Sequence, residues 1–368
     1  MESMTAPDAA TAPAATPEVA QKGEDMAMIR TAAELTRDLN TPSKLIYWGD
    51  FLASAATGYA ALYAAWAAHT GALAWASGWG WALLFGVVSV LTLYRAVLFI
   101  HELTHMRLSA VPGFWTGWHM IVGIPLLVPS FMYEGLHNTH HMKKKYGTSE
   151  DPEYLPLAHM KPWTLPAFVL IAILGPIGLL IRYGVLAPLS LVIPPLRRIV
   201  WQRYSGLVIN PDFRRRDPEP AIRRHVMLTE PFAALWGMTL IAGVATGFIP
   251  LSLFLTALAV VSAVMLLNQI RTLVAHLWAN DGAEMSVTAQ YLDSVNVPPP
   301  SPLPALWAPV GLRYHALHHL LPGLPYHALG EAHRRLVAAL GDQSTYHRTN
   351  YPGLPTLVAK LASSTMRG

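Results

Sequence analysis

The sequence predicts an all-α protein: an integral-membrane bundle of four to six spanning helices with a helical cap on the cytoplasmic side. Of the 368 residues, 53% are hydrophobic and only 13% are charged, about half the charged fraction of an ordinary soluble domain. The apolar residues gather in runs close to the roughly 20 residues that a spanning helix needs. There is no cysteine but there are 16 histidines, so disulfides and thiolate sites are excluded and any metal must be bound by nitrogen or oxygen.

The first 45 residues have a different character from the rest and predict an N-terminal tail, followed by one membrane domain over residues 46–368. Met1–Gln21 is rich in Ala, Pro and Thr without an apolar run, which predicts disorder. Glu24–Lys44 predicts a short amphipathic helix on the membrane surface.

Four apolar runs predict spanning helices: Phe51–Ala68, Trp79–Ile100, Pro231–Ile249 and Leu251–Leu267. A longer run, Trp163–Pro195, is interrupted by Pro176, Arg182 and Pro188, and predicts either a hairpin of two spans or a segment that does not cross. Val111–Phe131 contains three prolines and three glycines among apolar residues, among them Pro112, Gly117, Gly123 and Pro125. We expect it to be interfacial or re-entrant.

Basic residues gather in segments 1–50, 101–162, 196–230 and 268–368, whereas the loop 68–78 carries no acidic or basic residue apart from His69. The positive-inside rule places both termini and all four segments in the cytoplasm, at the cytoplasmic membrane in a bacterium. Every dense histidine group then lies on one side. The triplets Lys143–Lys145 and Arg214–Arg216 fit this anchoring role; alternatively they hold a lipid headgroup, an acyl carrier or a redox partner. No aromatic-interleaved basic stretch points to nucleic acid.

Three histidine motifs dominate the cytoplasmic segments. His101 and His105 are four residues apart at the end of a predicted span, so both rings share one helical face. The spacing H-x-x-H-H occurs twice, at His137, His140 and His141 and again at His315, His318 and His319. Three histidines in five residues are costly as core filler, because buried polar groups need partners. The motifs therefore predict metal binding.

Eight histidines exceed what one ion can use, since zinc, for example, takes four ligands. The number fits two metal ions with about four ligands each. Imidazole suits iron, copper, zinc and nickel, so the ligand type alone does not identify the metal.

The motifs HELTH, HNTHH and HALHH, in this order and with paired spans before the first and after the second, resemble the histidine boxes of membrane fatty-acid desaturases. The resemblance runs from about Pro42 to the C-terminus. It implies a non-haem centre of two irons, O2 as co-substrate, and insertion of a double bond into a fatty-acyl lipid, an acyl-CoA or an acyl-carrier substrate. It also implies His276 as a ninth ligand, while Thr272 stands where some relatives have an asparagine ligand. Because the chain has no cysteine cluster and no haem motif, an external ferredoxin, rubredoxin or cytochrome must supply electrons.

Other functions fit parts of the pattern. Hydroxylases and carotenoid ketolases belong to the same superfamily. His101–His105 also matches the H-E-x-x-H motif of zinc proteases, with Glu102 as the base, but an intramembrane protease leaves both H-x-x-H-H motifs unexplained. A receptor or scaffold with a structural metal would need fewer ligands.

Metal-bound imidazoles usually donate their second nitrogen to a carboxylate or carbonyl. The acids near the motifs are candidates for this role: Glu102, Glu134, Asp151, Glu153 and Asp281. His327 and His333, which follow the third motif closely, are further candidates. The remaining isolated histidines are expected to be structural: His69, His119, His159, His225 and His347.

Overall fold

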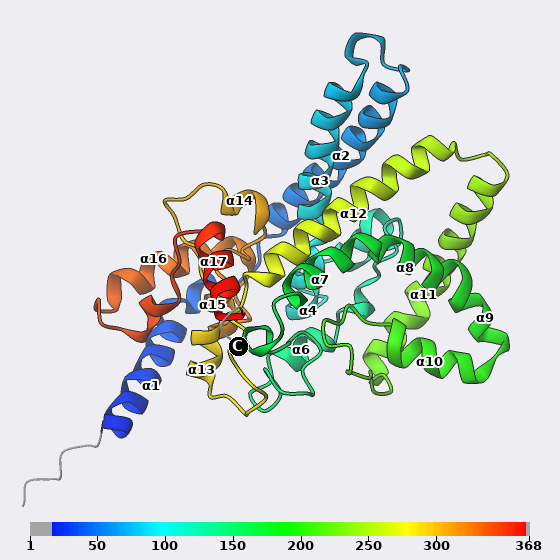
Figure 1. The fold of residues 1–368 in the computed structure, drawn as a ribbon. Coiled ribbons are helices and arrows are strands. Elements are labelled where there is room, and N and C mark those ends of the chain that lie inside the picture. The colour runs from blue at the N-terminus through cyan, green and yellow to red at the C-terminus, as the bar shows by residue number, and fades with distance from the viewer. Residues whose placement is uncertain (1–16, 366–368) are drawn as a thin grey trace, which may run out of the picture.

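The computed structural model describes residues 17–365, which form helices joined by loops, with isolated bridges but no strand (Figure 1). This confirms the predicted all-α class. Two long helical hairpins extend from a compact cap of short helices.

The first hairpin consists of α2 (Lys44–His69) and α3 (Trp79–Val97), which run antiparallel and project from the rest of the molecule (Figure 1). The Ser43 side chain caps α2 by accepting a hydrogen bond from the Ile46 N–H. At the tip, around η2 (Ala74–Ala76), Trp75 and Trp79 are both 72% exposed. Exposed tryptophans are typical of a membrane–water interface. At the opposite end α3 breaks at Leu98 and continues as α4 (Phe99–His105).

The second hairpin consists of α11 (Pro220–Ala245) and α12 (Leu251–Leu273). Helix α11 begins well before the predicted Pro231, which lies inside it. The helical runs that are long and apolar enough to cross a membrane are Trp79–His105, Thr164–Val192, Pro220–Ala245 and Leu251–Leu273. Helix α2 is not among these four, but it has 26 residues and lies along α3, so we infer that the two cross together.

The run Thr164–Val192 contains no reversal, so the alternative of a two-span hairpin is wrong. It is made of α7 (Thr164–Leu170), η6 (Ile171–Leu174), α8 (Gly175–Ile181), η7 (Arg182–Leu186) and α9 (Ala187–Val192). The next helix, α10 (Pro194–Tyr204), has 11 residues and is about 16 Å long, too short to recross a hydrocarbon layer of about 30 Å.

Both flanks of this stretch are tied to the loops that bear the histidines. The Ala158 N–H donates to the Trp278 carbonyl at 3.3 Å, and the Leu207 N–H donates to the Met132 carbonyl at 2.8 Å. We infer that residues 164–204 enter and leave on the same side, which is the non-crossing alternative.

The segment predicted to be interfacial or re-entrant, Val111–Phe131, contains two short helices, α5 (Phe114–Trp118) and η3 (His119–Gly123), and ends within a third, η4 (Ser130–Met132). Trp118 is buried and its indole N–H donates to the Ala96 carbonyl at 3.0 Å. The segment therefore packs against the base of the first hairpin.

The cap combines short helices from both halves of the chain. These are η1 (Arg37–Leu39), α6 (Leu136–His140), η5 (Leu157–His159), α13 (Val287–Asp293), α14 (Pro304–Trp307), α15 (His315–Leu320), η8 (Tyr326–Ala328), α16 (Leu329–Ala339), η9 (Thr345–Thr349) and α17 (Leu354–Thr365).

The N-terminal segment joins this cap through α1 (Pro17–Leu35). Most of the predicted disordered tail, up to residue 16, lies outside the described residues, but residues 17–21 are helical, so the prediction is wrong there. A helix is present in the region predicted to be amphipathic, but it ends at Leu35 rather than at Lys44, and it buries Met28 and Ala32 in a cluster with Leu336 of α16. Arg335 of α16 also pairs with Asp38. The cap therefore covers these apolar residues of α1, which the sequence predicts to face a membrane surface.

The contact between η7 and α11 gives a prediction for stability. A Cβ on Gly237 would lie 2.9 Å from the Gly184 nitrogen and 3.1 Å from its Cα. These are backbone atoms and cannot rotate away, so Gly237→Ala should lower the free energy of unfolding by about 1–3 kcal/mol. The thermal midpoint of the detergent-purified protein measures this. Gly86→Ala on α3, where no atom lies within 4 Å of the added Cβ, is the control, and equal midpoints for the two variants would contradict the packing.

Candidate metal centre

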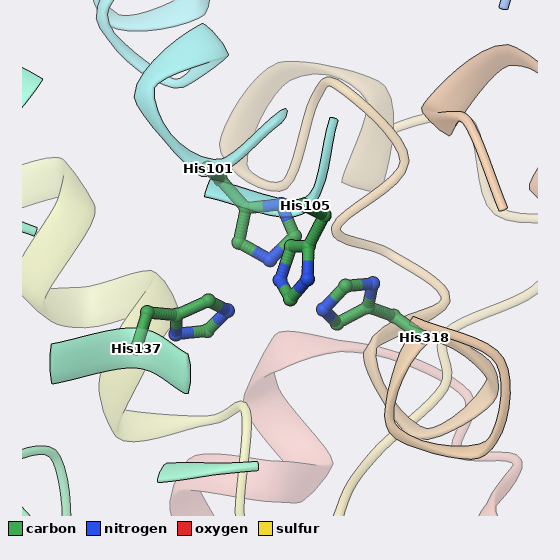
Figure 2. A group of neighbouring side chains, drawn as sticks. All are labelled: His101, His105, His137 and His318. Atoms are coloured by element: carbon green, nitrogen blue, oxygen red, sulfur yellow. The ribbon is translucent and has the colours of Figure 1, made fainter. Parts of the chain in front are cut away.

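A first group of four histidines is assembled from three separate segments. His101 and His105 lie on α4, the continuation of α3 beyond its break, with His137 on α6 and His318 on α15 (Figure 2). Their ligand nitrogens all lie within 4.8 Å of one another. The four-residue spacing of His101 and His105 places both rings on one side of α4, as predicted.

A second group contains His140, His276, His315 and His319, again with all ligand nitrogens within 4.8 Å. His276 lies three residues beyond the end of α12 at Leu273. Its Nε2 is 3.0 Å from Nε2 of His315, which is 3.2 Å from Nε2 of His319. Both H-x-x-H-H motifs are therefore divided between the two groups.

His141, the ninth predicted ligand, belongs to neither group of four but lies between them. Its Nε2 is 3.1 Å from Nε2 of His137 and 3.2 Å from Nε2 of His318. Its ring also stacks on His319 with centroids 4.3 Å apart. The structure thus brings all nine predicted histidines together.

The two groups fit a pair of metal ions. Nitrogens bound at about 2.1 Å to a common ion, at right angles, lie about 3.0 Å apart, close to the observed Nε2 separations. Nε2 of both His101 and His105 is buried without a hydrogen-bond partner among the described residues. Such orphaned nitrogens are costly unless something else binds them.

The protonation states suit the same role. Six of the clustered histidines outside the spanning helices have a pKa that burial lowers well below its ordinary value. They are His137, His141, His276, His315, His318 and His319. These rings are neutral at physiological pH. Neutral imidazole is the form that binds metals.

Comparison with known proteins agrees with this geometry. The sequence model of the fatty acid desaturase family matches residues 73–351. The chain belongs to this family. A protein named ceramide hydroxylase, from Caulobacter vibrioides (strain NA1000 / CB15N), is 50% identical over 336 residues, which cover 91% of this chain and 93% of the relative.

Membership of the desaturase family identifies the chain as an oxidoreductase of the membrane desaturase and hydroxylase superfamily, which uses non-haem diiron centres. Membership of this family argues against a protease or a scaffold as the function of the chain. The structure also argues against Glu102 as a protease base, because its carboxylate accepts hydrogen bonds from the Tyr47 hydroxyl and from the Tyr326 N–H.

Two of the predicted carboxylates bind histidines of this candidate centre. Asp151 lies 2.9 Å from Nδ1 of His140, and Glu153 lies 3.1 Å from Nδ1 of His137. Burial on its own would lower the pKa of His140, but the Asp151 carboxylate raises it above its ordinary value. Burial raises the pKa of Glu153 to about 7. A carboxylate on Nδ1 fixes the ring and leaves Nε2 free for a metal.

A third side chain that binds Nδ1 of a clustered histidine was not predicted. The Tyr146 hydroxyl lies 2.8 Å from Nδ1 of His276 and donates to Asp293 at 2.8 Å. Tyr146 belongs to a sequence segment that resembles desaturases, which is a weak signal for its role. Nothing in the sequence marks Asp293. Residues 146 and 293 meet only because the cap folds α13 against the loop after α6.

The other candidate acids and histidines do not tether ligands in this way. Glu102 approaches Nδ1 of its neighbour His101 at 3.5 Å but is engaged by Tyr47, Glu134 binds His225, and Asp281 is exposed. His327 accepts the Ser43 N–H, and His333 bonds the Tyr346 hydroxyl. The isolated histidines have local partners: Thr256 for His69, Trp115 for His119, Ala279 for His159, Glu134 for His225 and Leu340 for His347.

The tether to His140 gives a prediction for metal retention. Asp151→Asn keeps the shape of the side chain but removes its charge, so we expect metal binding to weaken by about 10–100-fold. Iron content after a timed challenge with a chelator measures the loss. Asp281→Asn, at the exposed acid that contacts no ligand, should behave as wild type. If both variants retained iron equally, the Asp151 carboxylate would have no part in holding the centre.

Proposed function

We propose that this protein is an O2-dependent hydroxylase of a ceramide-type, long-chain lipid, with two irons held by its nine clustered histidines. The observation that carries the proposal is the 50% identity to a ceramide hydroxylase along nearly the whole length of both chains. Desaturation of a fatty-acyl chain, the reaction that the histidine motifs first suggested, is the second candidate and is favoured by the family match.

In this proposal His101, His105, His137 and His318, joined by His141, hold one iron, and the second group holds the other. Bound iron supplies the oxidising power that cleavage of an unactivated C–H bond requires, which no side chain has. The chain's own part is to keep the imidazoles neutral and oriented, through Asp151, Glu153 and the Tyr146 hydroxyl, and to place the lipid chain.

The surroundings suit an alkyl substrate. The centre lies where α4 continues α3 and just beyond the end of α12, so a lipid would reach it from the bilayer. A cavity of about 130 Å³ adjoins His276, with the side chains of Leu273, Leu277, Leu357 and Leu361 in its wall. Electrons would come from an external ferredoxin, rubredoxin or cytochrome. The termini and the centre would face the cytoplasm, as the distribution of basic residues predicts.

The metal assignment predicts about two irons per chain in the detergent-purified protein, most of which His318→Ala should remove because this ring belongs to the first group. Elemental analysis measures iron and zinc together. His347→Ala, whose ring lies 3.4 Å from the Leu340 carbonyl and packs edge-on against Tyr346, should keep full iron. A single zinc that persists in His318→Ala would contradict a two-iron centre.

The reaction assignment predicts how oxygen is used. When the reconstituted protein, an electron donor and ceramide are incubated under 18O2, hydroxylation should give a product that carries one labelled oxygen atom. Desaturation gives a product that has lost two hydrogens and carries no label. An unlabelled, unsaturated product would show desaturation and contradict the hydroxylase proposal. Parallel incubations with His318→Ala should give neither product.

A further inference from the structure

A polar cavity of about 210 Å³ lies at the C-terminal end of α10, whereas the exposed apolar residues that lead into this helix lie at its other end. Its wall includes Arg203, Tyr204 and Asn210 together with Arg214 and Arg215. Three arginines thus line one small cavity that none of the nine clustered histidines lines.

Among the residues that the structure describes, none of these three arginines forms an ion pair, although the Glu134 carboxylate lies near enough to Arg215 to interact with its charge. Arg214 donates to the Pro211 and Phe213 carbonyls of its own loop, and Arg203 is exposed with no ion pair among the side chains that the structure describes. Arg215 is only 6% exposed and donates to the Ser205 and Glu134 carbonyls. Burial lowers the pKa of Arg215 to about 10. A buried guanidinium that hydrogen-bonds only to carbonyl groups is stabilised further by an anion within reach.

The usual repulsion of an anion by a helix C-terminus is reduced here. The last carbonyls of α10 already accept hydrogen bonds: that of Gln202 from the Arg215 N–H at 3.0 Å, that of Tyr204 from Arg182 at 3.0 Å, and that of Ser205 from Arg215. These contacts offset the negative end of the helix dipole. The cavity therefore keeps its positive potential.

The cavity lies at the level of the bilayer surface. The residues that lead into α10, Leu191, Val192 and Ile193, are 78%, 75% and 45% exposed, and such apolar side chains need lipid around them. On α10 itself Ile199 and Tyr204 are 46% and 50% exposed, beside Arg197, Arg198 and Arg203. Exposed apolar and basic residues side by side on one short helix are typical of an interfacial helix.

We infer that this cavity binds a phosphate group, that of an anionic phospholipid headgroup, through Arg203, Arg214 and Arg215. Guanidinium groups match phosphate oxygens in geometry and charge. The lipid's acyl chains would lie against the exposed apolar residues of α10 near the cavity, Ile199 and Tyr204, so the site anchors the segment 164–204 at the membrane surface. This role is separate from the metal centre and holds whichever reaction that centre performs.

The arginines of the triplet Arg214–Arg216 have different partners. Arg216 pairs with Glu150 at 3.1 Å, as does Lys145 of the other basic triplet at 3.0 Å. These two residues are engaged with an acid, whereas Arg214 faces the cavity. General attraction of basic residues to the cytoplasmic leaflet would not distinguish Arg214 from any other exposed arginine.

The test uses the full-length, metal-loaded protein and native mass spectrometry in detergent. Wild type, the double variant Arg203→Gln/Arg214→Gln and the control Arg198→Gln are titrated with phosphatidylglycerol, with phosphatidylcholine and with inorganic phosphate. Arg198 is exposed on the same helix but does not line the cavity. Wild type and Arg198→Gln should bind one phosphatidylglycerol at least fivefold more tightly than the double variant does. Equal iron content in all three shows that each is folded.

The other outcomes are decisive as well. Equal weakening in Arg198→Gln and in the double variant would mean diffuse attraction of charge and would overturn the site. Unchanged binding in the double variant would do the same. If inorganic phosphate at matched concentration displaces phosphatidylglycerol from wild type, the cavity takes free anions and the lipid assignment fails. Phosphatidylcholine bound as tightly as phosphatidylglycerol would remove the role of headgroup charge.

Discussion

The structure depends on holding nine imidazoles close together in a buried volume. Protonated rings at these distances would repel one another strongly in a medium of low polarity, so the fold must keep them neutral. Burial does this for most of them by lowering their pKa. Each histidine also needs a rigid support and a fixed ring orientation. The helices, the cap and the hydrogen bonds that join Asp151, Glu153 and Tyr146 to the rings meet these two needs.

Neutral imidazoles would leave the charge of two bound cations uncompensated, and the carboxylates around the centre could supply counter-charge. Asp151 and Glu153 lie on Nδ1 of their rings, and Asp293 acts through Tyr146. All three carboxylates are in contact with a ligand ring or one hydroxyl away from it. They can therefore offset positive charge without occupying positions on the metal. On the membrane side, α4 and α12 deliver His101 and His276 close to the bilayer, where a lipid chain can reach them.

The histidine motifs were predictable because their members are neighbours in sequence, and helix geometry alone places His101 beside His105. The spans were predictable for the same reason, since a bilayer imposes a length. His276 needed the family resemblance, because one histidine carries no spacing. Tyr146 and Asp293 could not be found, since they meet across 147 positions of chain. Glu134 and Asp281 were candidates for binding a clustered histidine but do not contact one. An acid that is close to a motif in sequence can still point away from it in the folded chain. The packing of α1 on α16 likewise joins residues about 300 positions apart.

The mixing of early and late histidines within each group has a consequence for biosynthesis. The third motif contributes His318 to one group and His315 and His319 to the other, so neither group exists until the ribosome has passed residue 319. By then both helical hairpins have been synthesised. If the two groups bind iron as proposed, the chain inserts into the bilayer without its ions, and iron is delivered afterwards to a protein that is already in place. Iron supply would then limit how much of the inserted protein becomes active, without limiting how much is made.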